Sequence, residues 1–167
     1  MNISYNWLKK YLIFDLSPED TAKKLTSLGL EVGTVEKIQT IKGGLEGLVT
    51  AKVVECEDHP NSDHLNITKV DAGNGELIQV VCGAPNCRAG LTTILATVGT
   101  TLYSGDESFT IKKSKIRGSE SFGMLCAEDE IGIGESHDGI IELPEGTALG
   151  IPAKDYYKIE DDYLIEV

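Results

Sequence analysis

Two histidines and several turn-forming polar residues lie together in the segment His59-Pro60-Asn61-Ser62-Asp63-His64-Leu65. Imidazoles beside carboxylates can hold a metal ion, and Asp58 and Asp63 would supply oxygen ligands. The two histidines, however, are separated by a proline-containing turn rather than lying on one face of a helix, so the spacing disfavours a metal site. Two interpretations remain open: a loop that ends one strand and sets the register of the next, or a surface on which Asn61 or His64 contacts RNA.

A second turn cluster, Cys82-Gly83-Ala84-Pro85-Asn86, follows the apolar run 78–81. A nucleophilic Cys82 would need a base and an environment that stabilises the thiolate, and nothing adjacent in the sequence supplies either. We therefore interpret Cys82 as a small buried thiol at the end of a strand. Asn86 and Arg88 are the polar side chains of this region whose chemistry suits contact with a nucleotide.

The basic residues cluster once, in Lys112-Lys113-Ser114-Lys115-Ile116-Arg117. In an extended strand, alternation would put Lys113, Lys115 and Arg117 on one face, where they could follow a phosphate backbone. A solvated outer face of a strand is the equally plain alternative. Aromatic residues for base stacking are scarce in this part of the chain, so the sequence favours recognition by shape and phosphate contact over base stacking.

The loop Ser119-Glu120-Ser121-Phe122-Gly123-Met124 places a serine two residues before a glycine. It lacks the first glycine of the Gly-x-Ser-x-Gly nucleophile elbow, and no convincing partner set of His and Asp follows. Ser121 could donate a hydrogen bond to a phosphate, or cap a short helix expected at 127–131. Gly123 and Met124 are expected to help close a barrel, with Met124 in the core.

Composition limits the function classes further. The chain has 167 residues and a net charge of −12, which argues against strong phosphate binding. The acidity is regional, because residues 127–167 carry −10 and residues 1–126 only −2. The four cysteines have no CxxC spacing, which indicates free buried thiols rather than a zinc site or disulfides. No apolar run is long enough for a transmembrane helix, and the acidic residues near the start exclude a secretory signal.

The pattern of elements predicts helices first and strands afterwards. Ser4–Leu12 has helical spacing, and Ser17-Pro18-Glu19-Asp20 is a typical helix start for a second helix that ends at Gly29. A hairpin connection is expected at 71–76. Short strands joined by turns favour a small closed barrel. Strands are expected at 48–56, 65–71, 77–81, 93–96, 109–116, 139–143 and 163–167.

These motifs together resemble the tRNA-binding domain of the EMAP-II type, an oligonucleotide-binding (OB) barrel. With the opening Asn2-Ile3-Ser4-Tyr5-Asn6-Trp7-Leu8, nearly the whole chain resembles the start of a bacterial phenylalanyl-tRNA synthetase β subunit. The resemblance implies an α+β fold in which an antiparallel OB-type barrel is inserted in a partial α/β N-terminal domain. The implied boundaries are 1–38 for the N-terminal segment, 39–151 for the barrel and 152–167 for a truncated return of the first domain.

The same resemblance implies a cytoplasmic ligase of the α₂β₂ type that uses ATP and Mg²⁺, with its aminoacylation and editing sites outside this segment. The segment itself is then expected to be non-catalytic and to hold no cofactor or metal. Its partners would be tRNA and the α subunit. Asn86 and Arg88 are RNA-contact candidates by resemblance as well as by residue type. At the position of His64 the family commonly has Lys or Arg, so a neutral side chain stands where a cation is usual.

Three hypotheses follow. The first is a non-catalytic tRNA-binding module with contacts from Asn61, His64, Asn86, Arg88, Lys113, Lys115, Arg117 and Ser121. The second is a structural or interaction module of the synthetase with negligible affinity of its own for RNA. The third, a small independent hydrolase, lacks converging acid, base and nucleophile.

Overall fold

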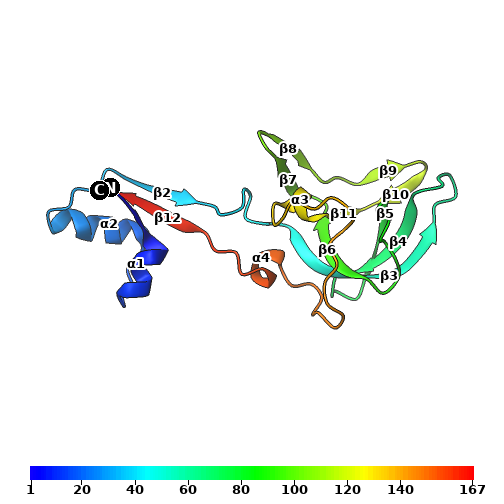
Figure 1. Cartoon of the computed structure of the whole chain (residues 1–167), viewed down its shortest axis with the longest axis horizontal. Coiled ribbons are helices and arrows are strands. Elements are labelled where there is room, and N and C mark those ends of the chain that lie inside the picture. Colours follow the sequence, from blue (N-terminus) through cyan, green and yellow to red (C-terminus); the bar gives the residue numbers. More distant parts are fainter. The chain divides into compact units, whose positions relative to one another are not determined.

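The computed structural model describes all 167 residues, which form two compact units. Unit 1 comprises Met1–Thr40 and Glu160–Val167, and unit 2 comprises Ile41–Ile159. Figure 1 shows unit 1 in blue and red and unit 2 in the intervening colours. The segment 152–159, which the resemblance assigned to the N-terminal domain, lies in unit 2, where Ala153 is fully buried in the core.

Unit 2 is built on a five-stranded antiparallel sheet that curls into a nearly closed barrel, as expected for an OB-type fold. The spatial order is β11-β6-β3-β4-β5. The two outer strands, β11 and β5, are linked by the residues just before β11. Phe122 N–H donates to Gln79 O (2.9 Å), and Val81 N–H donates to Ser121 Oγ (3.0 Å). The five strands are β3 (Leu48–Asp58), β4 (Asn66–Asp71), β5 (Leu77–Cys82), β6 (Thr92–Thr97) and β11 (Gly123–Leu125).

Alternating side chains of these strands fill the barrel. Val53, Val70, Val80 and Leu95 are fully buried, and together they form the centre of one core cluster. Gly123 begins β11 opposite β6, where a Cβ atom would lie 2.8 Å from Ala96 O. A side chain at this position would therefore push the closing strand away from β6.

Two short hairpins leave the barrel between β6 and β11 (Figure 1). They are β7 (Thr101–Ser104) with β8 (Glu107–Thr110), and β9 (Ser114–Ile116) with β10 (Ser119–Ser121). The continuous strand expected at 109–116 was wrong, because the chain breaks at Ile111. This side chain is buried, and its amide donates to Thr100 O (2.7 Å).

The rest of unit 2 covers the barrel with short elements. The expected strand at 139–143 was wrong: only a single bridge joins Thr92 to Leu143. The short helix expected at 127–131 is α3 (Glu128–Ile131), and its first turn is capped by Glu130, whose carboxylate accepts from Ala127 N–H (2.8 Å), not by Ser121. A further short helix, α4 (Ala153–Tyr156), precedes the end of the unit.

Unit 1 contains a three-stranded antiparallel sheet of order β1-β12-β2. Tyr5, Ala22 and Ile165 bring its helices and central strand into one core cluster. No helix of the chain is both long and apolar enough to cross a bilayer. The elements are β1 (Asn2–Ser4), α1 (Tyr5–Tyr11), α2 (Pro18–Ser27), β2 (Thr34–Ile38) and β12 (Asp162–Glu166).

The carboxylate of Asp162 joins β12 to the start of α1. It accepts from the Ser4 hydroxyl (2.5 Å), from Asn6 N–H (2.9 Å) and from its neighbour Tyr163 N–H (2.7 Å). Burial alone would raise the pKa of Asp162, but these three hydrogen bonds outweigh it and hold the pKa below its usual value. The ionised form is therefore the one that stabilises unit 1.

We expect Asp162→Asn to destabilise unit 1 at pH 7 by about 2 kcal/mol, the scale of hydrogen bonds to a charged group. Because the folded pKa is lower than the unfolded value of about 3.9, this contribution is complete above that pH and is lost as the pH falls through the folded pKa. Trp7, the single tryptophan, lies in α1, so urea unfolding followed by its fluorescence measures this unit. If the free energy of unfolding differs between variant and parent by the same amount at pH 7 and at a pH near 2, the assignment is contradicted.

Candidate nucleic-acid interface

The loop 59–65 and the β9–β10 hairpin, far apart in the sequence, are joined in space. His59 Nε2 donates to Ile116 O (2.9 Å), and Asn61 Nδ2 donates to Arg117 O (3.1 Å). The Arg117 guanidinium in turn donates to Asn61 O (3.4 Å). In an OB barrel these are the loop between the first two strands and the insertion between the last two, which flank the oligonucleotide-binding face.

His59 is the buried part of this junction, with 2% of its surface exposed. Its Nδ1 accepts from Asn61 N–H (3.0 Å), so Nε2 carries the proton that is donated to Ile116 O. Both ring nitrogens are therefore used within the protein, which leaves His59 no lone pair for a metal ion. Of the two interpretations of this loop, the structural one describes His59.

The rest of the loop is held by local hydrogen bonds. Ser62 Oγ accepts from His64 N–H and Leu65 N–H (both 3.3 Å), the arrangement expected of a polar turn. His64 extends into solvent beside Asp63, at 3.1 Å, and this hydrogen bond lowers the pKa of the Asp63 carboxyl. His64 is thus available to a ligand, whereas the amide of Asn61 already contacts the hairpin.

The predicted basic residues lie around the β9–β10 hairpin and are exposed. Arg117 occupies its two-residue turn with Gly118, at φ of 48° and 91°. Lys115 is opposite Glu120 in the strand register, and Lys113 Nζ lies 3.3 Å from the Glu120 carboxylate. Two of the three cations therefore flank one acid, and Arg117 contacts the loop 59–65 instead, so the three do not form an uninterrupted track.

Two residues that the sequence did not identify as contacts continue this surface across β4 and β5. Lys69 and Gln79 are paired in the strand register, and Lys69 Nζ donates to Gln79 Oε1 (2.8 Å). Gln79 Nε2 donates to Glu120 O (2.8 Å), which links both strands to the hairpin. Their alternation with the buried Thr68 and Val80 was the signal that could have identified them as outward-facing.

Asn86 and Arg88 belong to a different part of unit 2. The Asn86 side chain accepts from Ile140 N–H (3.0 Å) and donates to Ile140 O (2.8 Å). Arg88 donates to Asn86 O (2.9 Å) and to Glu142 (2.5 Å). The hydrogen bond from Arg88, with a second one from Asn86 Nδ2 (3.4 Å), lowers the pKa of Glu142. The structure thus uses both side chains to hold the segment 140–142 to the barrel.

Ser121 is also withdrawn from the surface, with 1% exposure. Its hydroxyl accepts from Val81 N–H (3.0 Å) and donates to Gly123 O (3.1 Å). Both hydrogen-bonding capacities are therefore used where the barrel closes, and the hydroxyl has no route to a phosphate.

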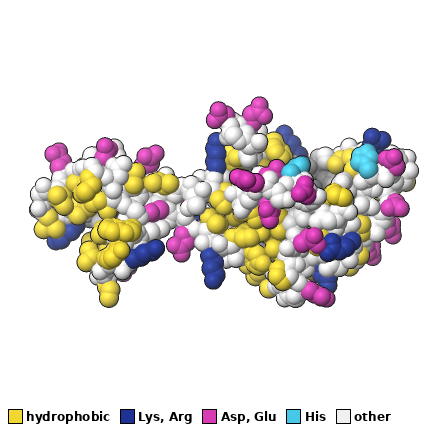
Figure 2. Space-filling view, in the orientation of Figure 1, with side chains coloured by type: hydrophobic (Ala, Val, Ile, Leu, Met, Phe, Trp, Pro, Cys, Tyr) yellow, Lys and Arg dark blue, Asp and Glu magenta, His cyan; other side chains and the backbone are white.

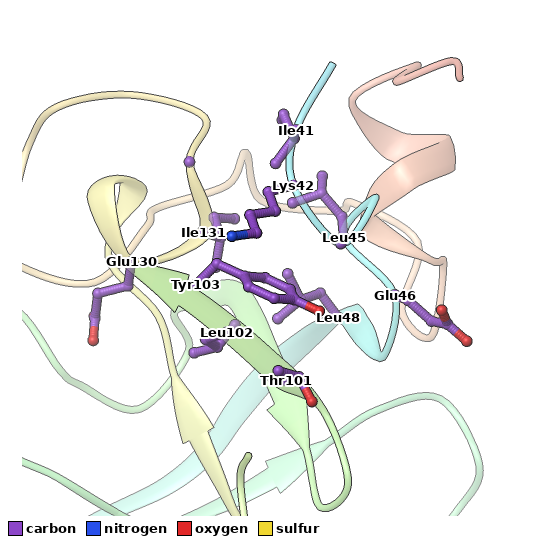
Figure 3. A pocket seen from close by; sticks show the side chains of 12 residues that line it. Ile41, Lys42, Leu45, Glu46, Leu48, Thr101, Leu102, Tyr103, Glu130 and Ile131 are labelled. Atoms are coloured by element: carbon purple, nitrogen blue, oxygen red, sulfur yellow. The ribbon is translucent and has the colours of Figure 1, made fainter. Parts of the chain in front are cut away.

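A separate pocket of unit 2 is lined by Tyr103, by apolar side chains and by polar ones that include Lys42 and Glu130 (Figure 3). Lys42 lies over the Tyr103 ring, with Nζ 5.2 Å from its centroid, and Gly43 packs so closely against the ring that it leaves no room for a Cβ atom. Leu45, Leu48 and Leu102 at the pocket belong to the barrel core. Tyr103 is thus packed by its own chain rather than presented as a stacking platform.

The four cysteines are free thiols. Cys82 and Cys126 are buried as predicted, whereas Cys56 and Cys87 are half-buried. Burial raises the pKa of Cys126 to about 12, so it stays protonated. A hydrogen bond from Cys87 lowers the pKa of Cys82, but Cys82 has only 6% of its surface exposed.

The family of the chain follows from comparison with known proteins. Residues 48–152 match the family model described as "Putative tRNA binding domain". The chain is 66% identical over its whole length to the phenylalanine–tRNA ligase beta subunit of Bacteroides fragilis, 61% to that of Porphyromonas gingivalis and 46% to that of Photorhabdus laumondii. It spans 20% of each of these relatives.

Among solved structures, a MetRS related protein from Pyrococcus horikoshii aligns with 62% of this chain and 85% of its own, at 25% identity and a TM-score of 0.45. The family model covers well over half of the chain and includes all five barrel strands and both sides of the loop–hairpin junction. The chain therefore belongs to the tRNA-binding domain family.

Proposed function

We propose that this chain is a non-catalytic tRNA-binding module of a phenylalanyl-tRNA synthetase β subunit. The observation that carries the proposal is the junction of the loop 59–65 with the basic β9–β10 hairpin, within a domain of a tRNA-binding family. The names of the relatives support the assignment to the β subunit.

The proposed contacts are mainly electrostatic, between basic side chains and RNA phosphates. Lys113, Lys115 and Arg117 are exposed around one hairpin, and His64 extends from the adjoining loop. Lysine and arginine attract phosphates and release counterions from the RNA, so binding should weaken as salt rises. We propose His64, Lys69, Lys113, Lys115 and Arg117 as the contact residues, with Asn61 positioning the loop.

The charge distribution limits the strength of this contact. Glu120 pairs with Lys113, and on the visible side of the molecule Lys and Arg alternate with Asp and Glu without a continuous basic area (Figure 2). The chain as a whole carries −12. These features favour modest affinity, and they support the second candidate function, an interaction module whose contacts are with other parts of the synthetase.

A second part of the proposal concerns the longer protein of which this chain would be a segment. We propose that the module assists charging of tRNA(Phe) by a cytoplasmic ligase that uses ATP and Mg²⁺. The α subunit would be its partner in an α₂β₂ assembly, and the chemistry would take place outside this segment. The support is the similarity to ligase β subunits, of which this chain spans one fifth.

Replacing Lys113, Lys115 and Arg117 together by alanine should weaken tRNA binding and flatten its dependence on salt. Each lost phosphate contact lowers the slope of log K against log salt by about 1, so the slope should fall by about 2–3. A filter-binding or anisotropy titration at several salt concentrations measures both quantities.

The matched control replaces Lys10, Lys23 and Lys24 of unit 1, which removes the same total charge from the exposed faces of α1 and α2. If both triple variants lose the same affinity and slope, the effect comes from net charge and the hairpin is not the contact site.

His59→Ala should weaken RNA binding by about tenfold, equivalent to about 1.4 kcal/mol, because the loop and the hairpin lose their buried connection. His59→Gln, whose amide can again donate to Ile116 O, should recover part of the affinity. Titrations below the unfolding temperature of each variant, with far-UV circular dichroism to verify folding, measure this. Wild-type affinity in a folded but destabilised His59→Ala variant would show that the junction serves stability alone.

A further inference from the structure

A groove lined by apolar and polar side chains lies on the outside of the barrel beside the basic hairpin. It is bordered by β4, β5, the end of β6 and the segment 120–122. Leu77 and Val98 are 50% and 51% exposed, which is high for large apolar side chains, and Phe122 lines the same groove half-buried. Exposed apolar side chains gathered at one groove mark a binding surface.

Phe122 is held in place by both its backbone and its ring. Its amide donates to Gln79 O (2.9 Å), and Lys113 Nζ lies 5.1 Å from the ring centroid. Its position is therefore defined before any ligand arrives. An aromatic ring fixed in this way suits stacking, because little conformational entropy is lost when a planar ligand binds.

Polar groups suited to a nucleotide line the same groove. The Gln79 amide and the Lys69 ammonium lie on its β4–β5 side, hydrogen-bonded to each other at 2.8 Å. Lys113 lies at the side of the groove that faces the hairpin, over the Phe122 ring. Lys115 follows it two residues later in the chain. The Gln79 amide accepts from Lys69 and donates to Glu120 O, which leaves one lone pair and one N–H for the edge of a base. Ammonium groups can bind the phosphates before and after that base.

We propose that this groove binds one unpaired nucleobase of RNA against Phe122, with Lys69 and Lys113 on the flanking phosphates. The inference rests on the proposed function and names its ligand class as single-stranded RNA. It revises the expectation, drawn from the scarcity of aromatic residues, that the domain recognises shape and phosphates alone. A base within a duplex is already stacked and cannot enter the groove.

An apolar side chain of another protein domain is the competing occupant. Leu77, Val98 and Phe122 would suit it equally well. Glu120 also lines the groove and pairs with Lys113, but the three cations Lys69, Lys113 and Lys115 outnumber this acid. This local surplus of positive charge favours the nucleotide, since a phosphate complements it and an apolar segment does not. The two occupants predict different results for one measurement. If the groove binds a nucleobase, RNA affinity depends on Phe122, and if it binds an apolar side chain of another domain, RNA affinity does not.

The test uses Phe122→Trp in a Trp7→Phe background, so that the single tryptophan lies in the groove. A single-stranded RNA of about ten nucleotides should quench its fluorescence, and a blunt duplex of the same length should bind more weakly, by about tenfold. Phe122→Ala, without the other changes, should weaken single-strand binding by about tenfold, and Phe122→Tyr should retain it. Phe109→Ala, at an exposed aromatic on β8, is the matched control and should change nothing.

The outcomes separate the two proposals. If tRNA and both oligonucleotides bind but Phe122→Ala leaves their affinities unchanged, the groove does not take a base, and this inference fails while the proposed function stands. The inference also fails if the single strand and the duplex bind with equal affinity and neither quenches the fluorescence of the tryptophan at position 122. If neither tRNA nor any oligonucleotide binds even at low salt, the proposed function itself fails.

Discussion

The buried imidazole of His59 connects two segments that lie more than fifty residues apart, and the candidate interface depends on that connection. One ring nitrogen accepts from the loop that contains it, and the other donates to the β9–β10 hairpin. Neither segment belongs to the barrel strands, so the pairing of those strands does not by itself join the loop to the hairpin. The imidazole joins them in one geometry, and Asn61 and Arg117 add exposed hydrogen bonds around it.

The barrel holds the hairpin of this junction beside β4 and β5, so that together they form one continuous surface. Its closing contacts, from Phe122 and Ser121 to β5, also fix the hairpin against the outer face of β4 and β5. Lys69 and Gln79 are thereby brought beside Glu120 and the hairpin cations. An acidic chain can thus present a local arrangement of cations, amides and an aromatic ring. The regional charge of this surface, rather than the net charge of the chain, governs what it can bind.

Much of the architecture could be predicted from the sequence because its signals are local. Ser17 and Pro18 begin α2 as expected, and alternating apolar residues identify β3 to β6. The site was predicted less well because its contacts are not local. Asn86 and Arg88 were expected to contact a nucleotide, but Asn86 bonds to Ile140, and Arg88, although exposed as expected, pairs with Glu142. Ser121 was expected at the surface, but it is buried against β5. Phe122 and Lys69 are brought together only by barrel closure, which no sequence window shows.

The central claim is that this surface binds tRNA without the rest of a synthetase. The most direct measurement is a titration of the chain with bulk tRNA at about 50 mM and about 200 mM salt, the range over which phosphate contacts weaken strongly. We expect measurable binding at the lower concentration that falls steeply at the higher one. No binding at about 50 mM salt, with both units folded, would contradict the claim and leave the domain an interaction module of a larger assembly.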